Sequence, residues 1–149
     1  MEAKEPKMRV LLVDDDELIR RAAARALVAQ LGCEVLTASS GYEAIALMKF
    51  GEHVDVAVVD LEMPGMDGVS VIKLMEGLAP ELPVGIWTGS LVVPDLPPCT
   101  RFVVKKSQPI RDLGYAVYAA GRPQSGVAER RSVIRQIRDT PTPKAGAGR

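Results

Sequence analysis

The sequence contains little cysteine and no long hydrophobic run. Only two of its 149 residues are cysteines. Cys33 and Cys99 are too few for a disulfide scaffold and lack the spacing of metal ligands, which agrees with a reducing compartment. No apolar run approaches the roughly 20 residues that span a bilayer, and residues 1–9 are charged, unlike a secretory signal. We therefore expect a cytoplasmic protein without a membrane span.

The chain also lacks a surplus of charge of either sign. Nineteen basic and nineteen acidic residues cancel, but residues 1–120 carry 12 basic and 17 acidic side chains, whereas residues 121–149 carry 7 and 2. This asymmetry predicts an acidic domain with a basic appendage. The length fits one domain of about 150 residues, and 47% hydrophobic residues suffice for a buried core.

Short apolar runs alternate along the chain with segments of helical periodicity. Because strands and helices that alternate at this spacing form parallel βαβ units, they predict a doubly wound α/β fold with helices on both faces of the sheet. The predicted strands are 9–13, 34–38, 54–59, 83–88 and 101–104, and the predicted helices are 17–30, 42–50, 69–75 and 109–120.

The domain organisation follows from composition. Residues 8–120 hold the alternating pattern and form the predicted domain, and residues 121–126 resemble a linker. A further helix is expected over 127–139, where apolar residues lie on one face among arginines. Residues 140–149 are rich in proline and glycine and are expected to be disordered.

Chemically useful side chains follow most of the predicted strands. Asp14 and Asp15 follow the first strand, Asp60 the third, and Thr88 and Lys105 end the fourth and fifth. Ligands of open α/β sheets bind outside the carboxyl ends of the strands, where the strand order reverses. The second strand ends in Ala38 and Ser39, as expected for a strand at the sheet edge, away from the site.

Three carboxylates at one sheet edge repel one another and need a cation among them. Oxygen ligands with open water positions suit Mg²⁺, which uses one or two carboxylates and leaves room for phosphate oxygens. A carboxylate beside such an ion can act as a nucleophile toward phosphorus and form an aspartyl phosphate. A lysine and a threonine hydroxyl would then stabilise the transferring phosphoryl group.

Four ordered motifs carry a resemblance to a known family. They read V-D-D-D-E-L-I-R from Val13, V-V-D-L-E-M-P-G-M-D-G from Val58, I-W-T-G-S from Ile86 and F-V-V-K from Phe102. Together they resemble the receiver domain of two-component response regulators, the family that includes the chemotaxis response regulator. The resemblance covers residues 8–120 and implies a flavodoxin-like five-stranded parallel sheet of order 2-1-3-4-5.

The resemblance assigns the acidic residues. It implies that Asp60 is the phosphoacceptor and that Asp14 and Asp15 hold Mg²⁺ together with it. Arg20 favours this register over one that uses Asp15 and Asp16. Glu62, two residues after Asp60, matches the residue whose backbone carbonyl completes the metal site.

The resemblance also assigns the switch residues. Thr88 matches the switch hydroxyl, and Phe102 matches the aromatic side chain that changes rotamer with it. Lys105 matches the lysine that contacts the phosphoryl group and joins Asp60 and Thr88 in the catalytic set. Lys105 is preferred over Lys106 because it follows Phe102 by three residues.

The chain departs from the family before its fifth strand. Lys105 follows Thr88 by only 17 positions, and the residues between them include Pro94, Pro97 and Pro98. Because proline disrupts helices, the fourth helix of the family is expected to be shortened or absent. That face is one the family uses for signalling, so we expect signalling through another surface, with residues 127–139 as a candidate.

The expected function is a phosphorylation-dependent switch without enzymatic activity beyond phosphorylation and dephosphorylation of Asp60. A histidine kinase or phosphotransfer protein would supply the phosphoryl group. An unknown downstream protein would read the switch, because nothing after Ala120 is long enough for a DNA-binding or enzymatic output domain. The protein is expected to be a monomer or a weak dimer.

Three alternatives stay open at the level of sequence. The first is a pseudo-receiver that binds proteins constitutively without phosphorylation. The second is a phosphatase with an aspartyl nucleophile, disfavoured because Glu62 stands where a second aspartate is expected. The third is nucleic-acid binding through the basic tail, whose signature would be a strong salt dependence.

Overall fold

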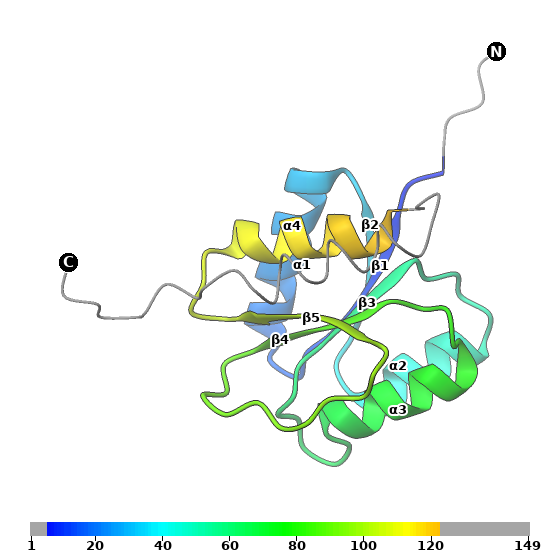
Figure 1. Cartoon of the computed structure of the whole chain (residues 1–149). Helices are drawn as coiled ribbons and strands as arrows, with labels where there is room; N and C mark the ends of the chain where they lie inside the picture. Colours follow the sequence, from blue (N-terminus) through cyan, green and yellow to red (C-terminus); the bar gives the residue numbers. More distant parts are fainter. Residues whose placement is uncertain (1–5, 123–149) are drawn as a thin grey trace.

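Strands and helices alternate strictly up to β4 in the computed structural model, which describes residues 6–122 (Figure 1). The five strands are β1 (Arg9–Val13), β2 (Glu34–Ala38), β3 (Val56–Val59), β4 (Val84–Thr88) and β5 (Thr100–Lys105). The four helices are α1 (Glu17–Leu31), α2 (Gly41–Lys49), α3 (Gly68–Leu78) and α4 (Ile110–Gly121).

The strands form one parallel sheet in the order β2-β1-β3-β4-β5. This order confirms the predicted flavodoxin-like fold. The order reverses beside β1, because the chain first moves outward to β2 and then crosses to β3 on the other side. The carboxyl ends of β1 and β3 are therefore neighbours at one edge of the sheet, which is where such folds bind ligands.

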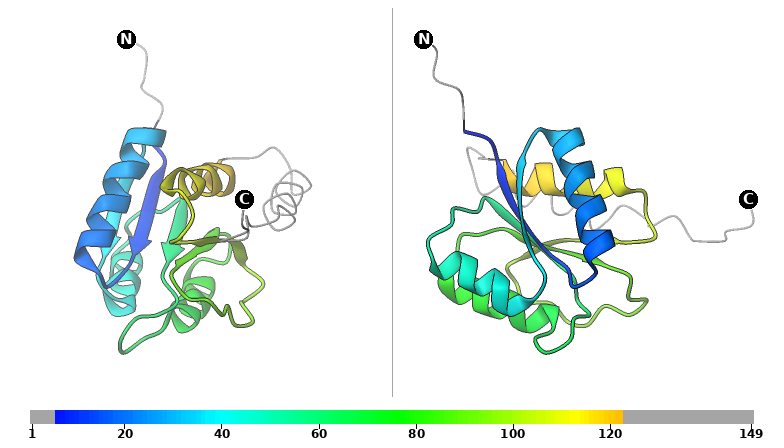
Figure 2. Two further views of the ribbon diagram at one scale, coloured as in Figure 1. Left: turned by 90° about the vertical axis from the view of Figure 1, so that its left-hand side faces the viewer. Right: turned by 180° about the vertical axis from the view of Figure 1, so that it is seen from behind.

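Helices cover both faces of the sheet, with α1 and α4 on one side and α2 and α3 on the other (Figure 2). Alternate strand residues supply the two cores. In β3, Val56 and Val58 face α1 and α4, whereas Ala57 and Val59 face α2 and α3. All four are fully buried, as expected for a central strand with both faces covered.

No helix connects β4 to β5 among the described residues, which confirms the prediction of a shortened or absent fourth helix. Residues 89–99 instead form an irregular segment. Val93, Leu96 and Cys99 from this segment pack against the core on the α2 and α3 side. The prolines therefore exclude the helix, and the segment still covers part of the sheet face that the helix would cover.

An irregularity in the pairing of β4 with β5 changes the register of β5. Val84 is paired with Thr100, but the next residue, Gly85, is paired with Phe102, so that Arg101 is an extra residue in β5. Such a bulge shifts every following side chain to the opposite face of the sheet. Phe102 consequently lies in the core on the α1 and α4 side.

The structure describes only the start of the predicted C-terminal segments. Helix α4 ends at Gly121, so the predicted linker 121–126 begins inside this helix. The predictions for 127–139 and 140–149 lie outside the described residues. Within 6–122, no helix is long and apolar enough to cross a membrane.

The start of α3 depends on one exposed side chain, Asp67, which caps the helix. Its carboxylate accepts a hydrogen bond of 2.8 Å from the backbone amide of Ser70. We expect Asp67→Ala to lower the free energy of unfolding by about 1 kcal/mol, and Asp67→Asn to lower it less, because asparagine also caps helices. Urea unfolding at neutral pH measures both effects.

The contribution of Asp67 is also expected to depend on pH. The hydrogen bond from the Ser70 backbone amide lowers the pKa of the Asp67 carboxyl below its ordinary value of 3.8. The unfolded state therefore binds the proton first, and the stabilisation is present above 3.8 and lost as the pH falls through the folded-state pKa. An unchanged stability difference between wild type and Asp67→Ala in acid would contradict this account.

Candidate functional site

Three carboxylates meet at the carboxyl ends of β1 and β3. Asp14 and Asp15 directly follow β1, and Asp60 directly follows β3. One carboxylate oxygen from each residue lies within 4.8 Å of the others. Asp14 and Asp60 are buried, whereas Asp15 is exposed, so the cluster opens to solvent on one side. The structure thus brings together the three predicted acidic residues.

Local hydrogen bonds determine which members of the Asp14–Asp16 run face the site. Asp14 Oδ1 accepts a bond of 2.9 Å from the backbone amide of Asp16, and Arg20 donates to the Asp14 carbonyl oxygen at 2.7 Å. The Asp16 carboxylate instead caps α1 by accepting from the Ile19 amide. Asp16 therefore has a structural role, and the predicted register with Asp14 and Asp15 agrees with the structure.

The lysine beside the carboxylates is Lys106. Its ammonium lies 2.7 Å from Asp14 Oδ2 and 3.1 Å from Asp60 Oδ2, and 5.2 Å from the centroid of the Trp87 ring. The predicted Lys105 donates instead to the backbone carbonyl of Ser90 at 2.6 Å. The structure therefore corrects the placement of the site lysine from Lys105 to Lys106.

The bulge at Arg101 explains this correction. Without the extra residue, Thr88 would be paired with Val104, and Lys105 would follow the paired strand. With it, Thr88 is paired with Lys105, and Lys106 follows. The backbone amide of Lys106 donates to the Thr88 carbonyl at 2.8 Å, which holds Lys106 at the end of the sheet. The motif spacing gives Lys105 as the lysine three residues after Phe102. The extra residue in β5 moves each following side chain to the opposite face of the sheet, so that Lys106 reaches the site instead.

The same bulge corrects the prediction for Phe102. Phe102 is 1% exposed and packs in the core beneath α1 and α4. Thr88 follows Val84 and Ile86 in the alternation of β4, and those residues face α2 and α3. Thr88 and Phe102 consequently lie on opposite faces of the sheet, so the structure does not bring the two predicted switch residues together.

Two glycines allow close packing, one against Phe102 and one against Asp60. A Cβ atom at Gly85 would lie 2.1–2.3 Å from three atoms of the Phe102 ring, so this glycine provides the space for Phe102. A Cβ atom at Gly68 would lie 2.3 Å from the carbonyl oxygen of Asp60. Gly68 therefore permits the close approach of α3 to the end of β3 at Asp60, a role that the sequence analysis missed although Gly68 ended a recognised motif.

Thr88 and Glu62 lie near the cluster without joining it. Thr88 is fully buried, and its hydroxyl oxygen accepts from the Ser90 amide at 3.1 Å. The Glu62 side chain is exposed, while its backbone amide donates to Asp60 Oδ1 at 3.4 Å. The contribution of the Glu62 carbonyl to a metal site stays a prediction.

Burial and charge pairing act on the two central ionisable groups. Burial raises the pKa of the Asp60 carboxyl, and the neighbouring Asp14 carboxylate raises it further, whereas Lys106 opposes both. Burial lowers the pKa of Lys106, but the Asp14 and Asp60 carboxylates outweigh it and raise the pKa above its ordinary value. Lys106 therefore remains a cation at neutral pH.

The cluster has the charge and the ligand atoms that suit a divalent metal ion. Three carboxylates and one ammonium leave two negative charges without compensation. Carboxylate oxygens are the ligands that Mg²⁺ uses, with further positions filled by water and phosphate. Asp14, Asp15 and Asp60 therefore fit a Mg²⁺ ion, and the exposed side at Asp15 gives access to it.

The sheet order and the acidic cluster define a flavodoxin-like protein with an acidic site where the strand order reverses. Residues 10–102 match the family described as response regulator receiver domain. The chain belongs to this family, whose members act in phosphorylation-dependent signalling. The match ends at Phe102, before both candidate lysines, so the similarity leaves the choice between them to the structure.

Named relatives share this domain. The chain is 34% identical over 76 residues to protein PilG of Pseudomonas aeruginosa, which covers 51% of this chain and 55% of that protein. It is 38% identical over 78 residues to protein-glutamate methylesterase/protein-glutamine glutaminase 2 of Cereibacter sphaeroides, which covers 52% of this chain and 21% of that protein. The chain thus matches between a fifth and about half of these relatives' lengths.

Solved structures agree with the fold. The response regulator TrrA of Thermotoga maritima, solved in complex with Mg²⁺ and BeF, is 28% identical with a TM-score of 0.68, covering 74% of this chain and 96% of that one. The receiver domain of the hybrid histidine kinase CckA is 30% identical with a TM-score of 0.65, covering 76% and 99%.

Proposed function

We propose that Asp60 accepts a phosphoryl group from a histidine kinase or a phosphotransfer protein in a Mg²⁺-dependent reaction. The observation that carries this proposal is the Asp60 carboxylate, buried beside Asp14 and held by the Lys106 ammonium. The TrrA structure with Mg²⁺ and BeF supports it as a property of a relative. Mg²⁺ held by Asp14, Asp15 and Asp60 would supply charge neutralisation for the phosphoryl oxygens.

The transfer involves the Asp60 carboxylate of this chain and a phosphohistidine of the donor protein. A carboxylate oxygen of Asp60 attacks phosphorus and forms a P–O bond as the P–N bond of the phosphohistidine breaks. The bonding electron pair returns to the imidazole nitrogen, which takes up a proton. Lys106 donates hydrogen bonds to the phosphoryl oxygens, and the Thr88 hydroxyl donates a hydrogen bond to one of them.

The output of this reaction is a change in affinity for a protein partner. A phosphoryl group adds negative charge beside Thr88 and Lys106 and biases the loops that carry them. Asp60 itself is the acceptor, so we propose no further catalytic activity for these residues. Because Phe102 is enclosed, this change passes through Thr88, Lys106 and the neighbouring loops without an aromatic rotamer change.

A second candidate is a constitutive binding module with the receiver fold. Two observations favour it: residues 89–99 replace the helix after β4, and the Phe102 ring is buried in the core against Gly85. Such a protein would bind its partner in a single conformation. The presence of Asp14, Asp15, Asp60, Thr88 and Lys106 together argues for phosphorylation, since a constitutive module does not need this chemistry.

Intact mass after incubation with a small-molecule phosphodonor distinguishes the two candidates. We expect the wild-type chain to gain the mass of one phosphoryl group when Mg²⁺ is present and to remain unmodified in a chelator. Asp60→Asn should abolish the gain, because the amide is not a nucleophile toward phosphorus.

The matched control is Asp95→Asn, an exposed carboxylate outside the cluster. This variant should be phosphorylated as fully as the wild type. An adduct that persists in Asp60→Asn would place the acceptor elsewhere. The complete absence of an adduct in the wild type, from either a small donor or a phosphorylated phosphotransfer protein, would favour the constitutive module.

A further inference from the structure

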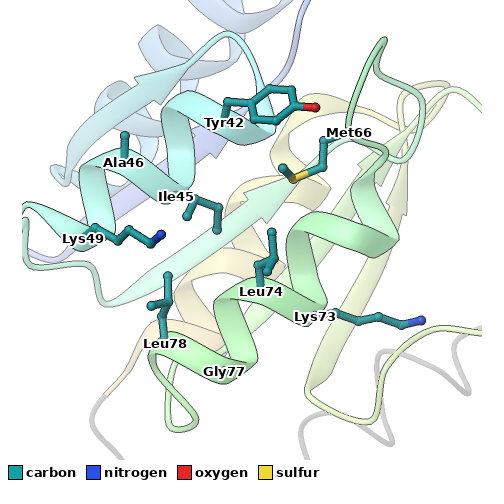
Figure 3. A pocket seen from close by; sticks show the side chains of 9 residues that line it. All are labelled: Tyr42, Ile45, Ala46, Lys49, Met66, Lys73, Leu74, Gly77 and Leu78. Carbon is teal, nitrogen blue, oxygen red and sulfur yellow. The ribbon is translucent and has the colours of Figure 1, made fainter.

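An apolar groove lies between α2 and α3, on the side of the sheet away from α1 and α4 (Figure 3). Its volume is about 530 Å³. Helix α2 contributes Ile45 and Ala46, and α3 contributes Leu74, Gly77 and Leu78. The Ile45, Leu74 and Leu78 side chains point into the space between the two helices.

Apolar side chains of this groove remain in contact with water. Tyr42 is 63% exposed, and Leu74 and Leu78 are each 45% exposed. Exposed apolar clusters of this kind mark interaction sites in soluble proteins. Leu74 and Leu78 are four residues apart on α3 and so lie one helical turn apart on the same face, where both line the groove.

Gly77 keeps the groove open. It lies in α3 with ordinary helical backbone geometry, where glycine is less favourable than alanine. A Cβ atom at this position would meet no atom within 4 Å, so the packing of the domain does not require a glycine. The missing side chain instead leaves space in the wall between Leu74 and Leu78.

The charges that line the groove have one sign. Lys49 extends from α2 toward α3, and Lys73 extends outward from α3. Neither lysine forms an ion pair with another residue of 6–122, and no acidic residue lines the groove in this part of the chain. An occupant with carboxylates beside apolar side chains would pair with both lysines.

We propose that this groove binds an amphipathic helix of a partner protein that carries acidic residues along the edges of its apolar face. Insertion of such a helix between two helices is a common mode of recognition. A small molecule fits less well, because apart from the two lysines and the Tyr42 hydroxyl the lining offers few polar groups that would orient it. The inference goes beyond the proposed function and does not depend on phosphorylation of Asp60.

The groove also touches the loop that begins at the phosphoacceptor. Met66, from the segment between β3 and α3, lines one end of the groove. A Cβ atom at Gly41 would lie 3.0 Å from Met66 Sδ, and one at Gly65 would lie 3.3 Å from the Tyr42 ring. This loop therefore packs directly on the first turn of α2, so an occupant of the groove would contact residues close to Asp60 in the chain.

The test uses the full chain and a fluorescent synthetic peptide of about 14 residues, the length of an ordinary helix. Leucines occupy one face of the peptide, with glutamates along its edges. A second peptide carries lysines in place of the glutamates. We expect fluorescence anisotropy to show at least about tenfold tighter binding of the acidic peptide.

Groove variants give the decisive comparison. Lys49→Glu combined with Lys73→Glu should reverse the preference between the two peptides, and Gly77→Trp should weaken the acidic peptide by at least about tenfold because it fills the groove. Arg25→Glu combined with Arg111→Glu makes the same charge change on α1 and α4 and should leave the preference unchanged. Circular dichroism verifies that each variant is folded.

Three results would overturn the proposal. One is equal binding of the two peptides by the wild type, or no binding of either. Another is that the acidic peptide binds the Gly77→Trp variant as tightly as it binds the wild type. The third is a dimer in sedimentation that Lys49→Glu with Lys73→Glu dissociates, because the groove would then belong to a second copy. Phosphorylation of Asp60 is measured separately, so its failure would not be mistaken for failure here.

Discussion

Lys106→Met is expected to slow phosphorylation of Asp60 by about 100-fold or more, because it removes a preorganised donor from the charge that develops on the phosphoryl group. The Lys106 ammonium is 3.1 Å from Asp60 Oδ2 and 2.7 Å from Asp14 Oδ2. Methionine preserves the length and the apolar stem of the side chain, so the core near Trp87 should remain packed. The rate of mass gain from a small phosphodonor measures the effect.

The same substitution should tighten the binding of Mg²⁺. The Lys106 ammonium pairs with the Asp14 and Asp60 carboxylates, which also fit the metal. Without this cation, their negative charge is no longer neutralised and attracts Mg²⁺ more strongly. Trp87 is the single tryptophan of the chain, and its ring lies 5.2 Å from the Lys106 ammonium. A titration of Trp87 fluorescence with Mg²⁺ reports the affinity of the wild type, and isothermal titration calorimetry measures it in both chains, which separates metal binding from the chemical step.

Lys105→Met is the matched control, since it removes the same charge one residue away. Lys105 donates to the Ser90 carbonyl oxygen and does not contact the carboxylates. The substitution Lys105→Met should therefore change neither the phosphorylation rate nor the Mg²⁺ affinity by more than about twofold. A loss of phosphorylation in Lys105→Met that equals or exceeds the loss in Lys106→Met would restore the assignment made from motif spacing and contradict the observed register of β5.

The sequence predicted the fold well because the relevant signals are local. Apolar runs of four to six residues, the caps of the helices and the aspartates at strand ends are all read from neighbouring residues. The carboxyl ends of parallel strands meet by topology, so Asp14, Asp15 and Asp60 could be placed together without coordinates. The three prolines of 89–99 likewise predicted the absence of a helix.

The misplacement of Lys105 and that of Phe102 share one cause, which is the bulge at Arg101. A bulge depends on how two strands pair, and the 100–106 segment itself reads as an ordinary strand. A change of one residue in register exchanges the two faces of the sheet, so Phe102 entered the core and Lys106 replaced Lys105 at the site. Gly85 in β4 was the available signal, because a glycine inside a strand often marks a bulge or a close approach.

Because Gly85 packs so closely against Phe102, Gly85→Ala is the substitution with the largest expected effect on stability. The new Cβ atom would lie 2.1–2.3 Å from three atoms of the buried Phe102 ring. Because β4 is an interior strand, the backbone has little freedom to move away. We expect the free energy of unfolding to fall by about 3 kcal/mol, at the upper end of the range for overpacked cores. Urea unfolding monitored by circular dichroism measures it.

Gly77→Ala provides the contrast, because its Cβ atom meets nothing within 4 Å. This variant should be as stable as the wild type or more stable, by up to about 1 kcal/mol, since alanine favours the helix. A similar loss of stability at both glycines would mean that the effect at Gly85 does not come from the Phe102 ring.

The decisive variant combines Gly85→Ala with Phe102→Leu. Phe102→Leu alone should cost about 1–2 kcal/mol through the space it leaves, but leucine vacates the positions that the new Cβ atom needs. The double variant should therefore be more stable than Gly85→Ala alone, with a coupling energy of at least about 1 kcal/mol. Additive losses would place Phe102 away from Gly85, hence on the Thr88 side of the sheet, where it could act as the aromatic switch. Coupling would instead confirm that Phe102 is enclosed, so that any response to phosphorylation must pass through Thr88, Lys106 and the adjoining loops.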